Sequence, residues 1–457
     1  LYYNTTASDN TAVGTGAMEQ NTTGANNTAI GRIALISNTT GASNTAVGKS
    51  ALQVNTTGGE NTAVGNHSLE SNTTGVHNTA MGYSALASNT TGQQNNAFGQ
   101  NALLSNTTGI YNVAMGKNAM AGNTTGQNNV AIGYHAGVSA TTAANNVVIG
   151  FTAGHDLSTG SSNTFMGTEA GYANTTGAEN TSVGKDSLKA NTTGPNNSAV
   201  GQGALLANTT GLRNSAVGSS ALPANTTGGY NTATGVLSLL GNTTGSYNTA
   251  SGYKALNDVT TGTHNIGKGY LAGTSLTTGS YNIFFGTNTK PEAVGNSQTI
   301  VLGTTGGSAV VGKGANTGFI NPNGGHIFQG NNASAWSQTS DERLKKNIVN
   351  NDVGLAKINA IQVRNFDYKT VAEVESDGVL NSNQAIIRTG TQLGVIAQEL
   401  ELICPDCVTT QSSGVKTVSG DDLHWHMLNA IKELSAKDVA SQTLIASLAA
   451  RITALEA

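Results

Sequence analysis

A repeat of seventeen residues constrains this 457-residue chain more than any other feature. The phrase Asn-Thr-Thr-Gly starts at Asn21 and returns at Asn38 and Asn55, always seventeen residues later. Counted from Asn4, residues 4–292 hold 289 positions, or 17 units of seventeen, without an insertion. A fixed period of this kind is typical of stacked repeat architectures. The short unit, rich in Gly, Thr and Val, favours β-coils over helix pairs.

Two positions of the unit never vary, when position one is the Asn of Asn-Thr-Thr-Gly. Position seven is always Asn and position eleven is always Gly. We expect the glycine to occupy a tight turn with positive φ or a close backbone approach. We expect the asparagine to stack from coil to coil in an amide ladder, which is a structural role rather than a ligand site. Examples are Asn27, Asn44 and Asn61 at position seven, and Gly31, Gly48 and Gly65 at position eleven.

Apolar residues recur in two pairs within each unit. Ala29-Ile30 at positions nine and ten predict a short strand, and Ala34-Leu35 at fourteen and fifteen predict a second buried pair. Because about four small apolar residues per coil cannot support a coil alone, neighbouring coils must stack into one core. Because the apolar core of one chain is so thin, we also expect several chains to share a core.

The units within residues 140–172 depart from the pattern. Glycines replace the usual Leu there, and His135 and His155 lie nearby. Two interpretations stay open, a packing adjustment or a specific binding site.

Composition narrows the function classes. The chain has 59 glycines, 5% aromatic residues, 10% charged residues and a formal charge of −4, so three ordinary domain cores are excluded. So small a charge predicts no nucleic-acid partner. No run of about 18 apolar residues occurs, which predicts no membrane insertion. Because Leu1-Tyr2-Tyr3 fits the end of a unit, we expect a fragment whose targeting signal and anchor lie upstream.

The composition changes towards the C-terminus. Residues 1–292 predict the solenoid fibre, 293–340 a β-rich neck, and 341–457 an α+β domain. The whole is expected to be mainly β, a β-solenoid followed by this smaller domain. Within 341–457 the patterns predict helices at 354–361 and 398–403, strands at 363–368, 392–397 and 415–418, and a long helix from about residue 421.

The long helix carries heptads. Position a holds His424, Ile431, Asp438, Ile445 and Ile452, and position d holds Met427, Leu434, Ser441, Leu448 and Leu455. This pattern predicts a coiled coil with a polar middle heptad, without by itself specifying three strands. His424 is interpreted as a polar layer of that coiled coil.

The two cysteines form one Cys404-Pro-Asp-Cys407. A zinc site usually needs a second such pair, so we interpret them as incidental thiols or a local disulfide. No metal and no cofactor are expected.

The junction at Thr339-Ser-Asp-Glu-Arg-Leu-Lys-Lys-Asn-Ile348 resembles the entry to the C-terminal intramolecular chaperone domain of phage tail spikes, tail fibres and endosialidases. Residues 392–400 and 430–434 match as well, and the resemblance covers roughly 336–457. It implies a domain that drives trimer assembly and then cuts the chain between Ser340 and Asp341. By match to the motif, Ser340 is the nucleophile and Lys345 the base, with Lys346 the rival base.

The chemistry asked of this pair is demanding. A serine hydroxyl needs a base, and a lysine serves only if its pKa falls towards neutrality. Attack of the Ser340 hydroxyl on its own carbonyl, which gives an ester that water opens, and direct activation of water both stay open.

The repeat is also similar in pattern, not in period, to the β-roll heads of trimeric autotransporter adhesins, as in residues 129–133. We therefore expect an extracellular homotrimeric fibre, a phage tail fibre or tail-fibre-like surface adhesin, with a host-surface glycan or protein as receptor. Its only enzymatic act would be one serine-peptidase cleavage of its own chain. The alternative is a structural spacer that retains an inactive chaperone domain.

Overall fold

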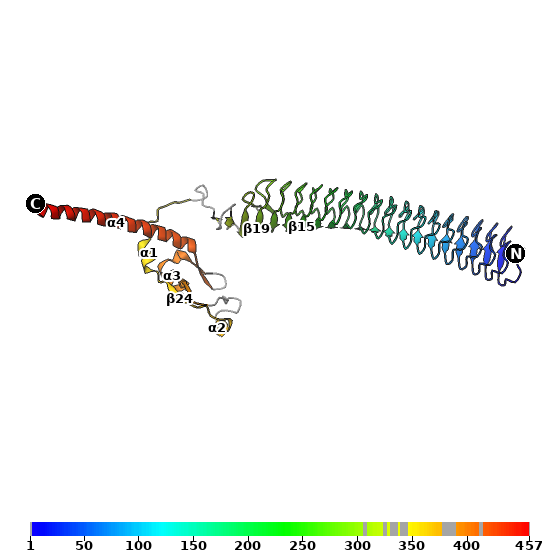
Figure 1. Cartoon of the computed structure of the whole chain (residues 1–457), viewed down its shortest axis with the longest axis horizontal. Helices are drawn as coiled ribbons and strands as arrows, with labels where there is room; N and C mark the ends of the chain where they lie inside the picture. Colours follow the sequence, from blue (N-terminus) through cyan, green and yellow to red (C-terminus); the bar gives the residue numbers. More distant parts are fainter. Residues whose placement is uncertain are drawn as a thin grey trace. The chain divides into compact units, whose positions relative to one another are not determined.

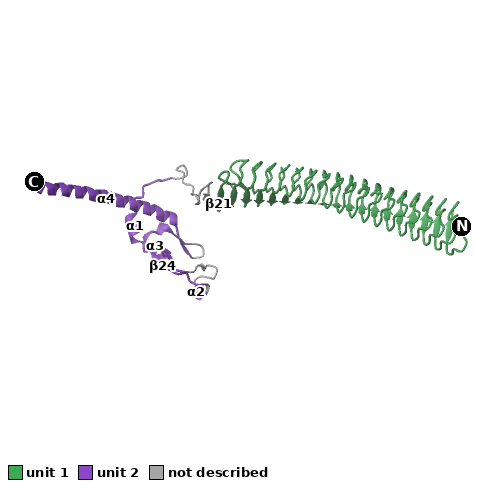
Figure 2. Cartoon of the chain, viewed as in Figure 1, with its two compact units in different colours: residues 1–339 green, residues 340–457 purple. Residues whose placement is uncertain are grey.

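Figure 1 shows a computed structural model of the chain, which describes residues 2–304, 309–322, 327–329, 337–338, 346–376, 390–410 and 415–456. Contacts divide the chain into two compact units, residues 1–339 and 340–457, coloured separately in Figure 2. Each unit is described by itself.

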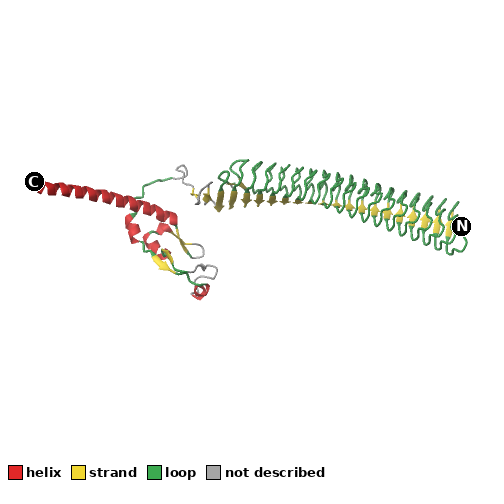
Figure 3. Ribbon diagram, viewed as in Figure 1, coloured by secondary structure: helices red, strands yellow, loops and turns green. Residues whose placement is uncertain are grey.

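Unit 1 is a parallel β-solenoid in which each seventeen-residue repeat forms one coil, with a three-residue strand along the same side of every coil (Figure 3). Successive strands pair in register, so that Ala29 lies opposite Ala46. The expected β-solenoid is therefore confirmed. The strands are β1 Thr11–Val13, β2 Thr28–Ile30, β3 Thr45–Val47, β4 Thr62–Val64, β5 Thr79–Met81, β6 Asn96–Phe98, β7 Val113–Met115, β8 Val130–Ile132, β9 Val147–Ile149, β10 Thr164–Met166, β11 Thr181–Val183, β12 Ser198–Val200, β13 Ser215–Val217, β14 Thr232–Thr234, β15 Thr249–Ser251, β16 Ile266–Lys268 and β17 Ile283–Phe285.

The core of each coil is made by positions nine, fourteen and fifteen. Ala29, Ala34 and Leu35 are fully buried, and the same positions are buried along the column. Position ten was expected to be buried and is not, since Ile30 is 41% exposed. Side chains alternate along a strand, so a buried position nine turns positions eight and ten outward. The column therefore carries a stripe of exposed Val, Ile and Met side chains, which we call the position-ten stripe.

The glycine at position eleven lies where the coils approach most closely. Gly31 has φ +143°, and a Cβ added there would lie 2.3 Å from the carbonyl oxygen of Gly48. Other corners use left-handed backbone without glycine, as at Leu35 with φ +50°. Because that conformation is unfavourable for leucine, a partner must hold it, and the Leu35 N–H donates to the Ala51 carbonyl at 3.0 Å.

The degenerate coils exchange large and small residues. Phe165 stands at position nine, where most coils have Ala, and it is fully buried. Gly154 and Gly171 stand where most coils have Leu, and a Cβ on Gly171 would lie 2.6 Å from the Phe165 ring. The glycines therefore make room for the ring, which favours the packing interpretation for the interior of these coils. One coil further on, buried Ser182 and Ser187 bond to each other at 2.6 Å.

The stack continues beyond residue 292. β19 (Ile300–Thr304) pairs in parallel with β17, and β21 (Gly318–Pro322) pairs in parallel with β19. The direction then reverses, because β22 (Ile327–Gln329) is antiparallel to β21, and β23 (Ser337–Gln338) is antiparallel to β22. A second short pair joins β18 (Thr289–Lys290) to β20 (Val310–Val311).

Unit 2 is the expected α+β unit ending in a long helix. Its helices are α1 Leu355–Ala360, α2 Val371–Ser376, α3 Ala397–Ile403, the 3-10 turn η3 Pro405–Cys407, and α4 Gly420–Glu456. Two antiparallel pairs join β24 (Arg364–Phe366) to β25 (Gln392–Gly394), and β26 (Val408–Thr410) to β27 (Lys416–Val418). The sequence patterns did not predict α2 or β26.

Helix α1 rests on the first half of α4. Glu433 of α4 accepts hydrogen bonds from the N–H groups of Gly354 and Leu355, at 2.7 and 3.1 Å. A carboxylate at a helix N-terminus satisfies donors that have no partner within the helix. Gly354 permits this approach, because a Cβ there would lie 2.2 Å from the Ala430 nitrogen.

Candidate functional site

The asparagines at position seven form a buried ladder along the column. The Asn44 side-chain oxygen accepts from the backbone N–H of Asn61 at 3.0 Å. The Asn44 amide nitrogen donates to Asn27 Oδ1 at 3.1 Å and to the Gly58 carbonyl at 2.9 Å. Each amide therefore joins its own coil to both neighbours. This satisfies polar groups that would otherwise be buried without partners.

Position one carries a second ladder that the sequence analysis missed. Asn38 Nδ2 donates to Asn21 Oδ1 at 2.7 Å and to the carbonyl of Gly41 at 2.8 Å. Asn55 repeats this arrangement on Asn38 at 2.8 Å. The signal was present in the sequence, because this is the Asn of the recurring Asn-Thr-Thr-Gly. The ladder was not predicted because position one is not Asn in every coil; it is Ala140, for example, in one of the degenerate coils.

Exposed aromatic rings gather outside the degenerate coils. Tyr134 stacks on Phe151 with centroids 5.4 Å apart and on His135 at 4.1 Å. His155 stacks on Tyr172 at 4.8 Å. Burial, with the neighbouring charges of His155 and Lys117, lowers the pKa of His135. Stacking of this kind stabilises the coil surface, while Tyr134 and Phe151 stay 44% and 53% exposed.

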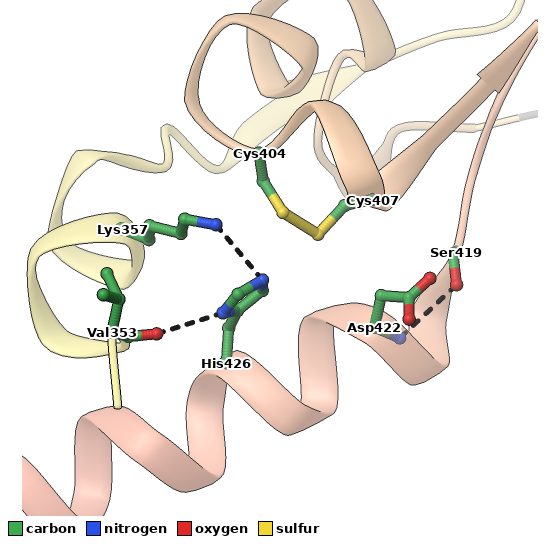
Figure 4. The surroundings of a disulfide bond; sticks show 7 residues. All are labelled: Val353, Lys357, Cys404, Cys407, Ser419, Asp422 and His426. Atoms are coloured by element: carbon green, nitrogen blue, oxygen red, sulfur yellow. Dashed lines mark hydrogen bonds between the residues drawn. A yellow bond between two sulfur atoms is a disulfide. The ribbon is translucent and has the colours of Figure 1, made fainter. Parts of the chain in front are cut away.

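A buried group of sulfur and nitrogen atoms lies in unit 2 (Figure 4). Cys404 and Cys407 form a disulfide between the end of α3 and η3, so of the two interpretations the structure has the local disulfide. His426 of α4 faces it, and all three side chains are buried. His426 Nδ1 lies 3.2 Å from the Val353 carbonyl, and Nε2 lies 3.4 Å from Lys357 Nζ.

In the second half of α4, the apolar side chains at heptad positions a and d are exposed in the part of the chain that the structure describes. Ile445 is 59% exposed and Leu448 is 46% exposed. Where α1 meets α4, the side chains of Leu355, Met427 and Leu434 line an apolar pocket of about 200 Å³ that is open to one side. We call the a and d side chains from Ile431 to Leu455 the α4 seam. Its members are Ile431, Leu434, Asp438, Ser441, Ile445, Leu448, Ile452 and Leu455.

The predicted cleavage site lies outside the described residues. Ser340, Asp341 and Lys345 are not among the residues that the structure describes, so their roles stay predictions. Lys346, the rival base, is described and is exposed to solvent. An exposed ammonium keeps its full hydration, whereas a lysine that acts as a base needs burial or a neighbouring cation.

Comparison with known families decides the nature of unit 2. Residues 340–409 match the family described as chaperone of endosialidase, and the match begins at Ser340. The C-terminal unit carries a chaperone-of-endosialidase domain. The resemblance that the junction motif suggested is thereby confirmed. No curated protein and no solved structure matches the chain.

The match to the chaperone domain covers the two cysteines but ends before α4. His426 and the α4 seam therefore lie beyond the matched residues, although α1 and η3 both pack on α4. Among the described helices, α4 included, none is both long and apolar enough to cross a membrane.

Proposed function

We propose that the chain is the subunit of a homotrimeric fibre outside the cell, either in a phage tail or on a cell surface. Its chaperone domain drives assembly and then separates by cleavage between Ser340 and Asp341. The observation that carries the proposal is the family match that starts at Ser340 and is joined to a repetitive solenoid. The chemistry is one hydrolysis per chain, with no external substrate.

Two surfaces support association of three copies. The position-ten stripe leaves Ile30, Met81, Met115 and Val217 between 41% and 43% exposed along one side of the column. The α4 seam adds a second row of exposed apolar side chains, of which Ile445, Leu448, Ile452 and Leu455 are between 46% and 86% exposed. One row follows the heptads of α4 and the other follows the repeat of the solenoid. In a trimer, other copies of the chain would bury these apolar side chains.

The cleavage step requires Ser340 as nucleophile and Lys345 as base. The Ser340 hydroxyl attacks its own carbonyl carbon and closes a four-membered β-lactone, the C–N bond to Asp341 breaks, and the nitrogen takes the proton as the new N-terminus. Water then opens this lactone and releases the column with a carboxylate and a free hydroxyl at Ser340. Lys345 accepts and returns the proton, so neither oxidant nor cofactor is needed.

Ser340→Ala and Lys345→Ala test the proposal, with Lys346→Ala as the matched control. Sedimentation should show a trimer for all of them. Intact mass should show cleavage at residue 340 in the unmodified and Lys346→Ala proteins only. An uncut trimer from the unmodified chain would favour a structural spacer with an inactive chaperone. A monomer would reject the trimer, and cutting that persists at the same bond in Ser340→Ala would reject the nucleophile.

The receptor function is a separate part of the proposal. A fibre that acts as an adhesin should bind a host-surface glycan or protein through its solenoid. Glycan-array binding by the purified residues 1–340 trimer tests this for glycans, and cell binding tests it for proteins. Failure of both would reduce the fibre to a spacer while leaving the assembly and cleavage steps intact.

A further inference from the structure

We propose that Cys404, Cys407 and His426 form a Zn²⁺ site when the two cysteines are reduced, with the fourth position taken by water. The disulfide and the metal site would then be alternative states of one buried cluster. This proposal does not depend on trimer formation or cleavage.

The three ligand atoms already lie together. The two sulfur atoms and one His426 ring nitrogen are within 4.8 Å of one another. Cys404 is 1% exposed, Cys407 0% and His426 7%. Zinc bonds of about 2.3 Å to sulfur and 2.0 Å to nitrogen place such atoms roughly 3.5 Å apart. Small side-chain rotations are enough to reach that spacing once the S–S bond is open, because the two Cα atoms are 5.3 Å apart.

The orientation of His426 is the second, independent observation. A carbonyl oxygen can only accept, so the contact with Val353 places the hydrogen of the neutral ring on Nδ1. Nε2 then carries the lone pair and faces the sulfur atoms (Figure 4). A backbone carbonyl that fixes the far nitrogen in this way is the usual support of a metal-binding histidine. Lys357, whose Nζ lies 3.4 Å from Nε2, has to turn away when the metal enters.

The two cysteines lie among apolar side chains of unit 2. Leu400 is buried in the same cluster as the cysteines, and Ile361, Val395 and Val408 pack against it. In the disulfide form the Val353 carbonyl and the Lys357 ammonium lie beside the two ring nitrogens of His426, so the metal would replace Lys357 at Nε2. Two thiolates and an imidazole form the donor set that zinc prefers over magnesium or calcium.

The reaction balances with a phosphine reductant. The phosphine attacks one sulfur, the S–S bond breaks, and water supplies the oxygen of the phosphine oxide and the two thiol protons. Zn²⁺ then displaces both protons, so binding should be tighter at higher pH. A bound zinc ion would link Cys407 of η3 to His426 of α4, whereas the disulfide links only Cys404 to Cys407.

The test uses the full-length chain, reduced with a phosphine and desalted without oxygen. Co²⁺ serves as the coloured probe and Zn²⁺ as the competitor. We expect one Co²⁺ per chain, with a thiolate-to-cobalt charge-transfer band and the strong visible bands of tetrahedral cobalt, all removed by Zn²⁺. The chain with its disulfide intact should show none of these bands.

Variants decide which side chains bind. His426→Leu should weaken Co²⁺ binding at least about tenfold, as should Cys404→Ala and Cys407→Ala. His424→Leu is the matched control, because His424 lies two residues earlier on the same helix and is exposed. Circular dichroism checks that α4 persists. If His426→Leu does not fold, the cysteine variants and the disulfide-intact chain still decide the result. Reduced protein without charge-transfer absorption, or a folded His426→Leu with parental affinity, would overturn the proposal.

Discussion

The backbone N–H of Asn214 donates to the side-chain oxygen of Asn197, one coil earlier, at 3.0 Å. Asn197 in turn donates to the Gly211 carbonyl at 2.9 Å, and it is 1% exposed. Asn197→Ala removes both bonds and leaves the buried N–H of Asn214 without a partner, whereas the Gly211 carbonyl keeps the bond that Asn208 donates at 2.9 Å. We expect the free energy of unfolding to fall by about 1–3 kcal/mol for each buried group left unpaired.

Thermal and denaturant unfolding measure this loss. Thr193→Ala is the matched control, because Thr193 lies in the same coil but is exposed. Equal melting temperatures for Asn197→Ala, Thr193→Ala and the parent would show that the ladder does not stabilise the column.

Phe165 offers a test of the large-to-small exchange in the degenerate coils. Phe165→Ala should lower the free energy of unfolding by about 3–5 kcal/mol, because the ring is fully buried and the glycines around it leave a cavity. Adding Gly171→Leu restores the Ala and Leu pair of the regular coils. Leu188, at that position in the next coil, already adopts φ +49°. Most of the loss should return in the double variant, as followed by thermal unfolding, whereas Gly171→Leu alone should clash with the ring. A double variant no more stable than Phe165→Ala would refute this account of the packing.

The α4 seam predicts an assembly defect that can be separated from folding. Ile445→Asp and Leu448→Asp place a charge among apolar side chains in the proposed trimer, but at exposed positions in a single chain. Sedimentation should show loss of the trimer, while circular dichroism should show the solenoid unchanged. Ser447→Asp, between the two positions, is the control and should remain trimeric. Trimers that survive both seam variants would place the assembly surface elsewhere, and the position-ten stripe would be the next surface to test.

Lys189 predicts a small, pH-dependent effect. It forms ion pairs with Glu169 and Asp186, and hydrogen bonds to both carboxylates raise the pKa of Lys189. Burial opposes ionisation of Asp186, yet hydrogen bonds with Lys189 and Glu169 and the lysine charges hold its pKa below its ordinary value. A carboxyl group whose pKa is lowered by folding stabilises the folded state above about pH 4. This stabilisation is lost as the pH falls and the carboxylate becomes protonated.

Lys189→Met should therefore cost less than about 1 kcal/mol at neutral pH, because its side chain is 41% exposed and the pairs are screened. The difference from the parent should shrink below about pH 4, as measured by denaturant unfolding across pH. Lys185→Met, whose nitrogen is 3.8 Å from Asp186, should have a smaller effect. A larger loss of stability in Lys185→Met than in Lys189→Met would contradict this prediction, because it would show that Lys185 makes the stronger contribution.

The repeat made the solenoid predictable, because a period of seventeen without insertion places each strand beside the next. Which side of a strand faces inward was not decided by the period, so Ile30 was wrongly expected in the core. The helices and strands of the chaperone domain were largely visible as local patterns. The cluster of Cys404, Cys407 and His426 was not, since it depends on how η3 packs against a helix that follows it in the sequence. His426 was passed over because helical spacing sets it apart from His424.

The reversal of direction at β22 determines how long the parallel column can be. A parallel coil presents the same hydrogen-bonding edge to the next coil as it received from the last, so such a stack has no inherent length limit. β22 and β23 run antiparallel and are three and two residues long, which gives a further coil no matching edge. These two strands cap the parallel column at this end. A fibre built from these subunits would therefore have its length set by the number of coils encoded, rather than by polymerisation end to end.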